Sequence, residues 1–171
     1  MSITVVRGDI TTQPVEALVT AGNSALRAGS GVNGAVHAAA GPRLLQASRS
    51  LAPCPAGSAV VTPAFDLAPV RWVIHAVGPH YGDRDDAELL KSAYRSALAR
   101  ADEVGARSVA FPSISTGVYG YPEPEAAEVS VAALLAAYTE VEWVLAARRL
   151  RQANGRPVAR RARHLRVRPK R

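Results

Sequence analysis

Short apolar runs alternate with helical segments along most of the chain, and this alternation constrains the fold more than any other feature. The runs are rich in β-branched residues and are bounded by glycine and proline, which is typical of strands. The segment from Asp85 to Val104 instead repeats apolar residues at intervals of three and four, which predicts an amphipathic helix. Strands and helices that alternate in this way favour a three-layer α/β domain with a largely parallel sheet.

The expected elements follow from the same patterns. The predicted strands are Ile3–Val6, Val15–Ala21, Ala59–Thr62, Val70–Val77, Ser108–Phe111 and Val141–Ala147. The predicted helices cover Ala35–Ala40, Pro42–Ser50, Asp85–Val104 and a segment that starts at Pro122 and carries Val131, Leu134, Leu135 and Tyr138 on one face.

Length and composition limit the class of protein. With 171 residues, of which 48% are hydrophobic, the chain can bury one good core but not two. The single cysteine, Cys54, cannot form an internal disulfide, and no run approaches the roughly 18 apolar residues of a membrane span. We expect one soluble, cytoplasmic, monomeric domain with no membrane partner.

Charge is distributed unevenly. Residues 1–147 hold 10 basic and 14 acidic residues, a net charge of −4, whereas residues 148–171 hold 11 basic residues and no acid, which together give +7. We therefore divide the chain into a domain, 1–147, and a basic C-terminal tail, 148–171. The tail could bind nucleic acid through phosphates, but it lacks aromatic residues for base stacking. We favour a solvated or poorly ordered terminus.

The stretch from Thr20 to Gly41 is the predicted functional centre. It passes from a strand end through a glycine-rich loop into an alanine-rich helix. Glycine lets the backbone approach a ligand closely, and the N–H groups and dipole of a helix N-terminus attract anions. A second loop, Pro112–Tyr121, also follows a strand, and its Ser115, Thr116 and Gly117 can offer N–H groups and hydroxyls to a phosphate. Two such loops at strand ends suggest a diphosphate ligand.

Two better-known phosphate motifs fit less well. The chain has no GK[ST] sequence, so a Walker A loop is excluded. GSGVNG at residues 29–34 matches GxGxxG, but several residues separate it from the preceding strand, and no Asp or Glu occurs between Gly34 and Asp66. The dinucleotide fingerprint needs the glycines directly after a strand and an acid about 20 residues later, so we disfavour a Rossmann fold.

Five segments in order resemble the macrodomain family, MacroD type. They are GDI (8–10), TAGNSAL (20–26), GSGVNGAVHAAAG (29–41), VIHAVGP (73–79) and FPSISTGVYGYP (111–122). The resemblance implies an α/β/α macrodomain with a mixed, roughly six-stranded sheet. It also implies binding of ADP-ribose and hydrolysis of ADP-ribosyl esters, either O-acetyl-ADP-ribose or ADP-ribosylated acidic side chains.

The resemblance also implies binding roles for particular residues. Asp9 would accept a hydrogen bond from the adenine amine and Ile10 would donate its backbone N–H, although a GD pair alone indicates a turn or helix cap. Tyr119 would lie against the distal ribose, whereas by itself it would be a packed loop residue. The backbone N–H groups that would bind the two phosphates belong to Gly31 and Val32, and to Ser115, Thr116, Gly117 and Val118.

Two asparagines would carry the chemistry. Asn23 matches the family residue that orients the ribose and the attacking water, and outside this context it would be a turn residue. Asn33 stands where active members commonly have an aspartate base, and an amide cannot take a proton. General-base help is worth about 10²–10⁴ in rate, so the chain is either a hydrolase assisted by a substrate phosphate or a catalytically silent ADP-ribose reader. Thr20 also replaces a family asparagine.

We expect neither a cofactor nor a metal. His37, His75, His80 and Cys54 fit no metal-binding spacing, and we interpret His37 and His75 as structural residues with satisfied hydrogen bonds. The expected partners are ADP-ribose, O-acetyl-ADP-ribose or an ADP-ribosylated protein. Nucleic acid would bind only through the tail, and a nucleic-acid-associated protein is the third hypothesis.

Overall fold

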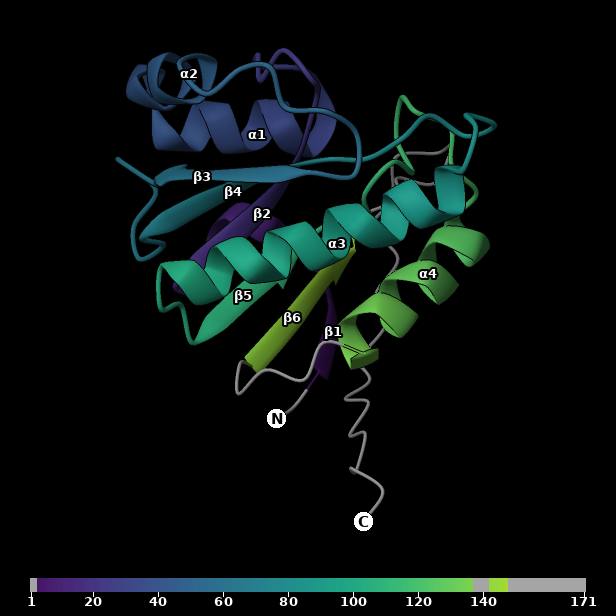
Figure 1. The fold of residues 1–171 in the computed structure, drawn as a ribbon. Coiled ribbons are helices and arrows are strands. Elements are labelled where there is room, and N and C mark those ends of the chain that lie inside the picture. The colour runs from purple at the N-terminus through teal and green to yellow at the C-terminus, as the bar shows by residue number, and fades with distance from the viewer. Residues whose placement is uncertain (1–2, 137–141, 148–171) are drawn as a thin grey trace, which may run out of the picture.

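A six-stranded mixed sheet forms the centre of the protein (Figure 1). The computed structural model describes residues 3–136 and 142–147. The strands lie in the order β1-β6-β5-β2-β4-β3, and every neighbouring pair is parallel except β3 and β4. The strands are β1 (Ile3–Arg7), β2 (Ala17–Gly22), β3 (Ala59–Pro63), β4 (Trp72–Val77), β5 (Ser108–Phe111) and β6 (Glu142–Ala147).

Helices cover both faces of this sheet (Figure 1). Alternation along β2 gives the two faces, because Leu18 packs with the residues of α1 and α2 whereas Val19 packs with those of α3. The result is the predicted three-layer α/β/α arrangement. The helices are α1 (Gly31–Ala40), α2 (Pro42–Arg49), α3 (Asp86–Glu103) and α4 (Glu123–Ala136).

The predicted elements are confirmed, with small differences at their ends. β4 begins at Trp72 rather than Val70, because the chain around Pro69 turns before it joins the sheet. One element was not predicted, the 3-10 helix η1 at Ile10–Thr12, which is too short for a periodic pattern. Tyr138 and the tail 148–171 lie outside the described residues, and the domain boundary at 147 stays a prediction. No described helix has the length and hydropathy to cross a membrane.

Tyr94 attaches α3 to the loop that follows β5. Its side chain is fully buried, its hydroxyl donates to the Pro112 carbonyl (3.1 Å), and it accepts from the Ile114 N–H (3.0 Å). Burial raises the pKa of Tyr94 to about 12, so the hydroxyl keeps its proton and can do both. One buried hydroxyl therefore satisfies two backbone groups at the start of a predicted binding loop.

Replacing Tyr94 with phenylalanine tests this link. We expect Tyr94→Phe to lower the free energy of unfolding by about 2 kcal/mol, because the buried Ile114 N–H loses its acceptor. Urea unfolding measures the change. The control is Tyr81→Phe, since Tyr81 is half-exposed and its hydroxyl makes no hydrogen bond to the part of the chain that the structure describes. Equal losses in the two variants would show that the bridge adds no stability.

Candidate functional site

The residues predicted to bind ligand meet at one edge of the sheet. β1, β2, β4, β5 and β6 are parallel, so their carboxyl ends face the same way. The loops that leave this edge include residues 8–9, residues 23–30, residues 78–85 and residues 112–122. In parallel sheets this edge is where ligands bind.

The loop between β2 and α1 exposes the N-terminus of α1. Ser30 occupies the N-cap position, but its side chain makes no capping hydrogen bond, so it does not cover the first-turn N–H groups. Gly31 has a positive φ of 63°, and a Cβ on Gly34 would collide with the Gly29 carbonyl oxygen. These two glycines are therefore required by the tight entry into the helix.

The side chains of Asn23 and Asn33 both lie close to Gly29. A Cβ built on Gly29 would be 3.6 Å from Asn33 Oδ1 and 4.0 Å from Asn23 Nδ2. Asn23 is fixed by Arg27, whose N–H donates to Asn23 Oδ1 (3.2 Å) and whose carbonyl accepts from Asn23 Nδ2 (3.0 Å). The fold thus brings the two predicted catalytic amides together, and Asn23 also has the turn role that its residue type suggests.

The orientation of the Asn33 amide follows from its hydrogen bond. Asn33 is buried, and its Oδ1 accepts from the Gly29 N–H at 2.7 Å. A backbone N–H can only donate, so the oxygen of the amide must face it and Nδ2 points elsewhere. The amide therefore offers a hydrogen-bond donor to the site and no basic atom.

Asp9 acts as a cap in the structure. Its Oδ1 accepts from the Thr11 N–H (2.9 Å) and from the Thr11 hydroxyl (2.7 Å), which closes the N-terminus of η1. Ile10 is buried directly after it. The carboxylate has a second oxygen, Oδ2, for which no partner is recorded within the described part of the chain. The capping role is confirmed, and the adenine role stays a prediction.

The loop after β5 is built from nested turns around Ser115. Ser115 has a positive φ of 66°, and its Oγ is buried without a hydrogen-bond partner among the described residues. The Tyr121 N–H donates to the Ser115 carbonyl, and the Gly120 N–H to the Gly117 carbonyl, both at 3.0 Å. The Thr116 hydroxyl donates to Ser113 O (3.0 Å), so its proton is already engaged. The side chain of Val118 at the tip is 85% exposed.

The segment after β4 supports this loop, although no binding role was predicted for that segment. A Cβ on Gly78 would collide with the Ser115 hydroxyl and lie 2.6 Å from Ile114 Cγ2. The His80 ring lies 3.9 Å from the Tyr119 ring, measured between centroids. The sequence feature that could have identified this supporting segment is VIHAVGP, which belongs to the resemblance. Its one polar side chain, His75, was interpreted as structural.

The two buried histidines differ in their hydrogen bonding. His75 Nε2 lies 3.0 Å from the Thr62 hydroxyl, so His75 is satisfied as predicted. That prediction is wrong for His37, because neither ring nitrogen has a partner among the described residues; the hydroxyl of Thr20, which is paired with His75 between β2 and β4, also lacks one there. The centroids of the two rings are 6.1 Å apart. Burial lowers the pKa of His75 to about 4, with a smaller effect of His37, and burial lowers the pKa of His37 too.

Comparison with known proteins identifies the family. A model of the macro domain matches residues 19–130. An O-acetyl-ADP-ribose deacetylase of Enterobacter cloacae is 51% identical over 135 residues, which are 75% of this chain and 74% of the relative. The chain belongs to the macro domain family. No metal-binding group of three or more histidine, cysteine or acidic residues occurs in the part of this macrodomain that the structure describes.

Solved structures agree in fold. The Oceanobacillus iheyensis macrodomain with ADP matches this macrodomain with a TM-score of 0.79 and 38% identity, over 84% of this chain and 81% of the other. The Trypanosoma brucei macrodomain in complex with ADP-ribose matches with a TM-score of 0.78 and 35% identity, over 86% of this chain and 63% of the other.

The close approach at Gly78 gives a testable requirement. We expect Gly78→Ala to lower the free energy of unfolding by about 1–3 kcal/mol, because the added methyl must displace Ser115 and Ile114. Chemical denaturation measures this. The matched control is Gly117→Ala in the loop itself, where a Cβ would meet nothing within 4 Å. The close contact would be disproved if Gly78→Ala were as stable as the control.

Burial of His75 predicts a pH dependence of stability. The unfolded chain binds a proton at His75 below about pH 6.5, whereas the folded protein does so only near pH 4. The contribution of His75 to the free energy of unfolding is therefore constant above pH 6.5, and it falls by up to roughly 3 kcal/mol as the pH drops to 4. Denaturant unfolding at pH 7 and pH 4.5 should show a smaller loss in His75→Gln than in the wild type. The same loss in both proteins would contradict this origin.

Proposed function

We propose that this macrodomain binds ADP-ribose and hydrolyses ADP-ribosyl esters, either O-acetyl-ADP-ribose or ADP-ribosylated acidic side chains. The observation that carries the proposal is the pairing of Asn23 and Asn33 at Gly29, next to an uncapped helix N-terminus. This chain is 51% identical over 135 residues to an O-acetyl-ADP-ribose deacetylase. The relatives solved with ADP and with ADP-ribose support the same ligand class.

The two phosphates fit the two loops. The N–H groups of Gly31 and Val32 at the start of α1 would bind one phosphate with the help of the helix dipole. The N–H groups of Ser115, Thr116, Gly117 and Val118 would bind the other. The Ser115 hydroxyl, buried and without a partner among the described residues, is a suitable additional donor to a phosphate oxygen.

The ends of the ligand would contact the remaining predicted residues. Oδ2 of Asp9 would accept a hydrogen bond from the adenine amine, since Oδ1 is used by Thr11. The Ile10 N–H would donate nearby. Tyr119, which directly follows Val118 in the same loop, would lie against the distal ribose.

Hydrolysis would proceed by direct attack of water. Water adds to the carbonyl carbon of the ester, the bond from that carbon to the ribose oxygen breaks, and the products from O-acetyl-ADP-ribose are acetate and ADP-ribose. Asn23 would orient the ribose and the water, and Asn33 would donate from Nδ2 to a ribose hydroxyl or the water. Because no carboxylate stands at position 33, an oxygen of the substrate phosphate would accept the proton of the water, and the leaving ribose oxygen would take up a proton to become the hydroxyl of ADP-ribose.

The Asn33 amide also favours a second candidate function, that of a catalytically silent ADP-ribose-binding module. A buried amide that gives its oxygen to Gly29 can recognise a ligand without activating water. Both functions use the same binding residues, and they differ only in turnover.

Other parts of the proposal concern the context of the site. We propose that residues 1–147 act as the macrodomain, that any nucleic-acid binding would be confined to the tail 148–171, and that the protein is a cytoplasmic monomer. The charge difference between the two parts of the chain supports the separate treatment of the tail.

Restoring a carboxylate tests the catalytic assignment. In Asn33→Asp, one oxygen can keep the Gly29 hydrogen bond while the other becomes a base. We expect O-acetyl-ADP-ribose turnover to rise by roughly 100-fold, the lower end of the 10²–10⁴ that general-base help is usually worth. Release of ADP-ribose measures the rate, and calorimetry measures ADP-ribose binding. Asn33→Ala, which loses the Gly29 contact, is the control and should be slower than the wild type.

The outcomes separate the candidates. If the wild type and Asn33→Asp are both inert although ADP-ribose binds, the silent module is correct. If ADP-ribose fails to bind at millimolar concentration, both candidates are wrong.

A further inference from the structure

The segment between β4 and α3 holds the outer part of the predicted phosphate loop. The His80 ring stacks on the Tyr119 ring with centroids 3.9 Å apart and planes tilted by 34°. Next to it, the Tyr81 N–H donates to the Tyr119 carbonyl at 2.9 Å. Both the ring and the backbone of Tyr119 are therefore in contact with this segment.

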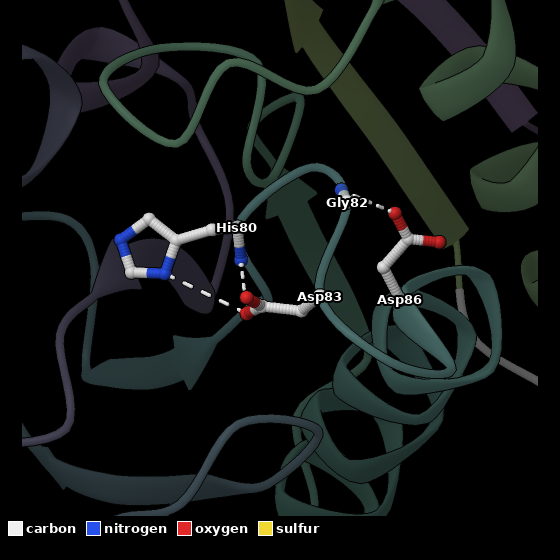
Figure 2. A network of polar contacts seen from close by, with 4 residues as sticks. All are labelled: His80, Gly82, Asp83 and Asp86. Atoms are coloured by element: carbon white, nitrogen blue, oxygen red, sulfur yellow. Dashed lines mark hydrogen bonds and ion pairs between the residues drawn. The ribbon is translucent and has the colours of Figure 1, made fainter.

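His80 is itself held by Asp83, three residues later in the same segment. The Asp83 Oδ2 accepts from the His80 N–H at 3.0 Å and lies 3.6 Å from His80 Nδ1, as Figure 2 shows. In the same view the Gly82 N–H donates to Asp86 Oδ2 at 2.8 Å, in the first turn of α3. The Asp83 carboxylate thus braces the segment from within, and the Asp86 carboxylate attaches it to α3 (Figure 2).

Tyr119 has few other restraints. Val118, its neighbour at the tip of the loop, is 85% exposed, and Gly120 has a positive φ of 70°. Within the described residues, the stack with His80 is the one ring contact recorded for Tyr119, and its hydroxyl has no recorded hydrogen bond. The stack with His80 therefore contributes to the orientation of the ring.

We infer that His80 is a positioning residue, which holds the Tyr119 ring in place as a wall of the ribose site, and that Asp83 holds His80. This inference rests on the proposed function, since it takes Tyr119 as the residue beside the distal ribose. A ring held before the ligand arrives loses less conformational freedom on binding, so the stack strengthens binding without touching the ester. An aromatic pair of this kind is worth roughly 3- to 10-fold in affinity.

The first test needs no ligand. Hydrogen exchange of the Tyr81 amide reports on the Tyr119 loop, because this N–H donates to the Tyr119 carbonyl. We expect exchange at least about 5-fold faster in His80→Ala, and near the wild-type rate in His80→Phe, which keeps a ring. The matched control is Arg84→Ala, since the Arg84 side chain is 96% exposed in the same segment. Unchanged exchange in His80→Ala would overturn the inference.

The second test uses ADP-ribose and O-acetyl-ADP-ribose. In His80→Ala, Kd and KM should rise by roughly 3- to 10-fold while kcat stays within about 2-fold, and His80→Phe should restore both. In a Tyr119→Ala background, His80→Ala should cause no further loss. An equal loss in that background, or a fall in kcat alone, would overturn the inference. If the wild type binds no ADP-ribose, the proposed function fails, and the exchange measurement still decides whether His80 orders Tyr119.

Discussion

The parallel pairing of β2 with both β4 and β5 determines where the candidate site lies. β2 pairs with β4 along its whole length, from Ala17 to Gly22, and with β5 at Ala17 and Leu18. Because the three strands run the same way, the loops that carry Asn23, Gly78 and Ser115 leave the sheet side by side. Gly78 then allows the second and third of these loops to touch, which a larger residue would prevent.

The sequence was sufficient for the architecture because each strand and helix carries its own local pattern. β5 was predicted at the residues where it occurs, and the amide chemistry of Asn33 follows from its residue type. The partner of Asn33 was not predictable, because the Gly29 contact depends on the positive φ of Gly31. The stack of His80 on Tyr119 joins residues far apart in the sequence, and only the packing of two loops brings them together.

The site combines firm positioning with weak chemistry. Asn23 is held through both the oxygen and the nitrogen of its side-chain amide, and Asn33 is held through its amide oxygen. Their geometry therefore exists before any ligand is bound. Neither residue can hold a proton taken from water. The same arrangement would serve recognition as well as it serves hydrolysis, and replacing the amide nitrogen of residue 33 with an oxygen would add the base that the site lacks.

The left-handed backbone of Ser115 has a consequence for the evolution of this protein. A residue with a side chain costs about 1–3 kcal/mol in such a conformation, and a glycine would avoid most of that cost. The chain instead keeps a serine, whose buried hydroxyl is not used by any described part of the fold. Strained residues of this kind cluster at ligand-binding sites, so a strained serine with an unused hydroxyl points to a pressure on ligand binding rather than on folding.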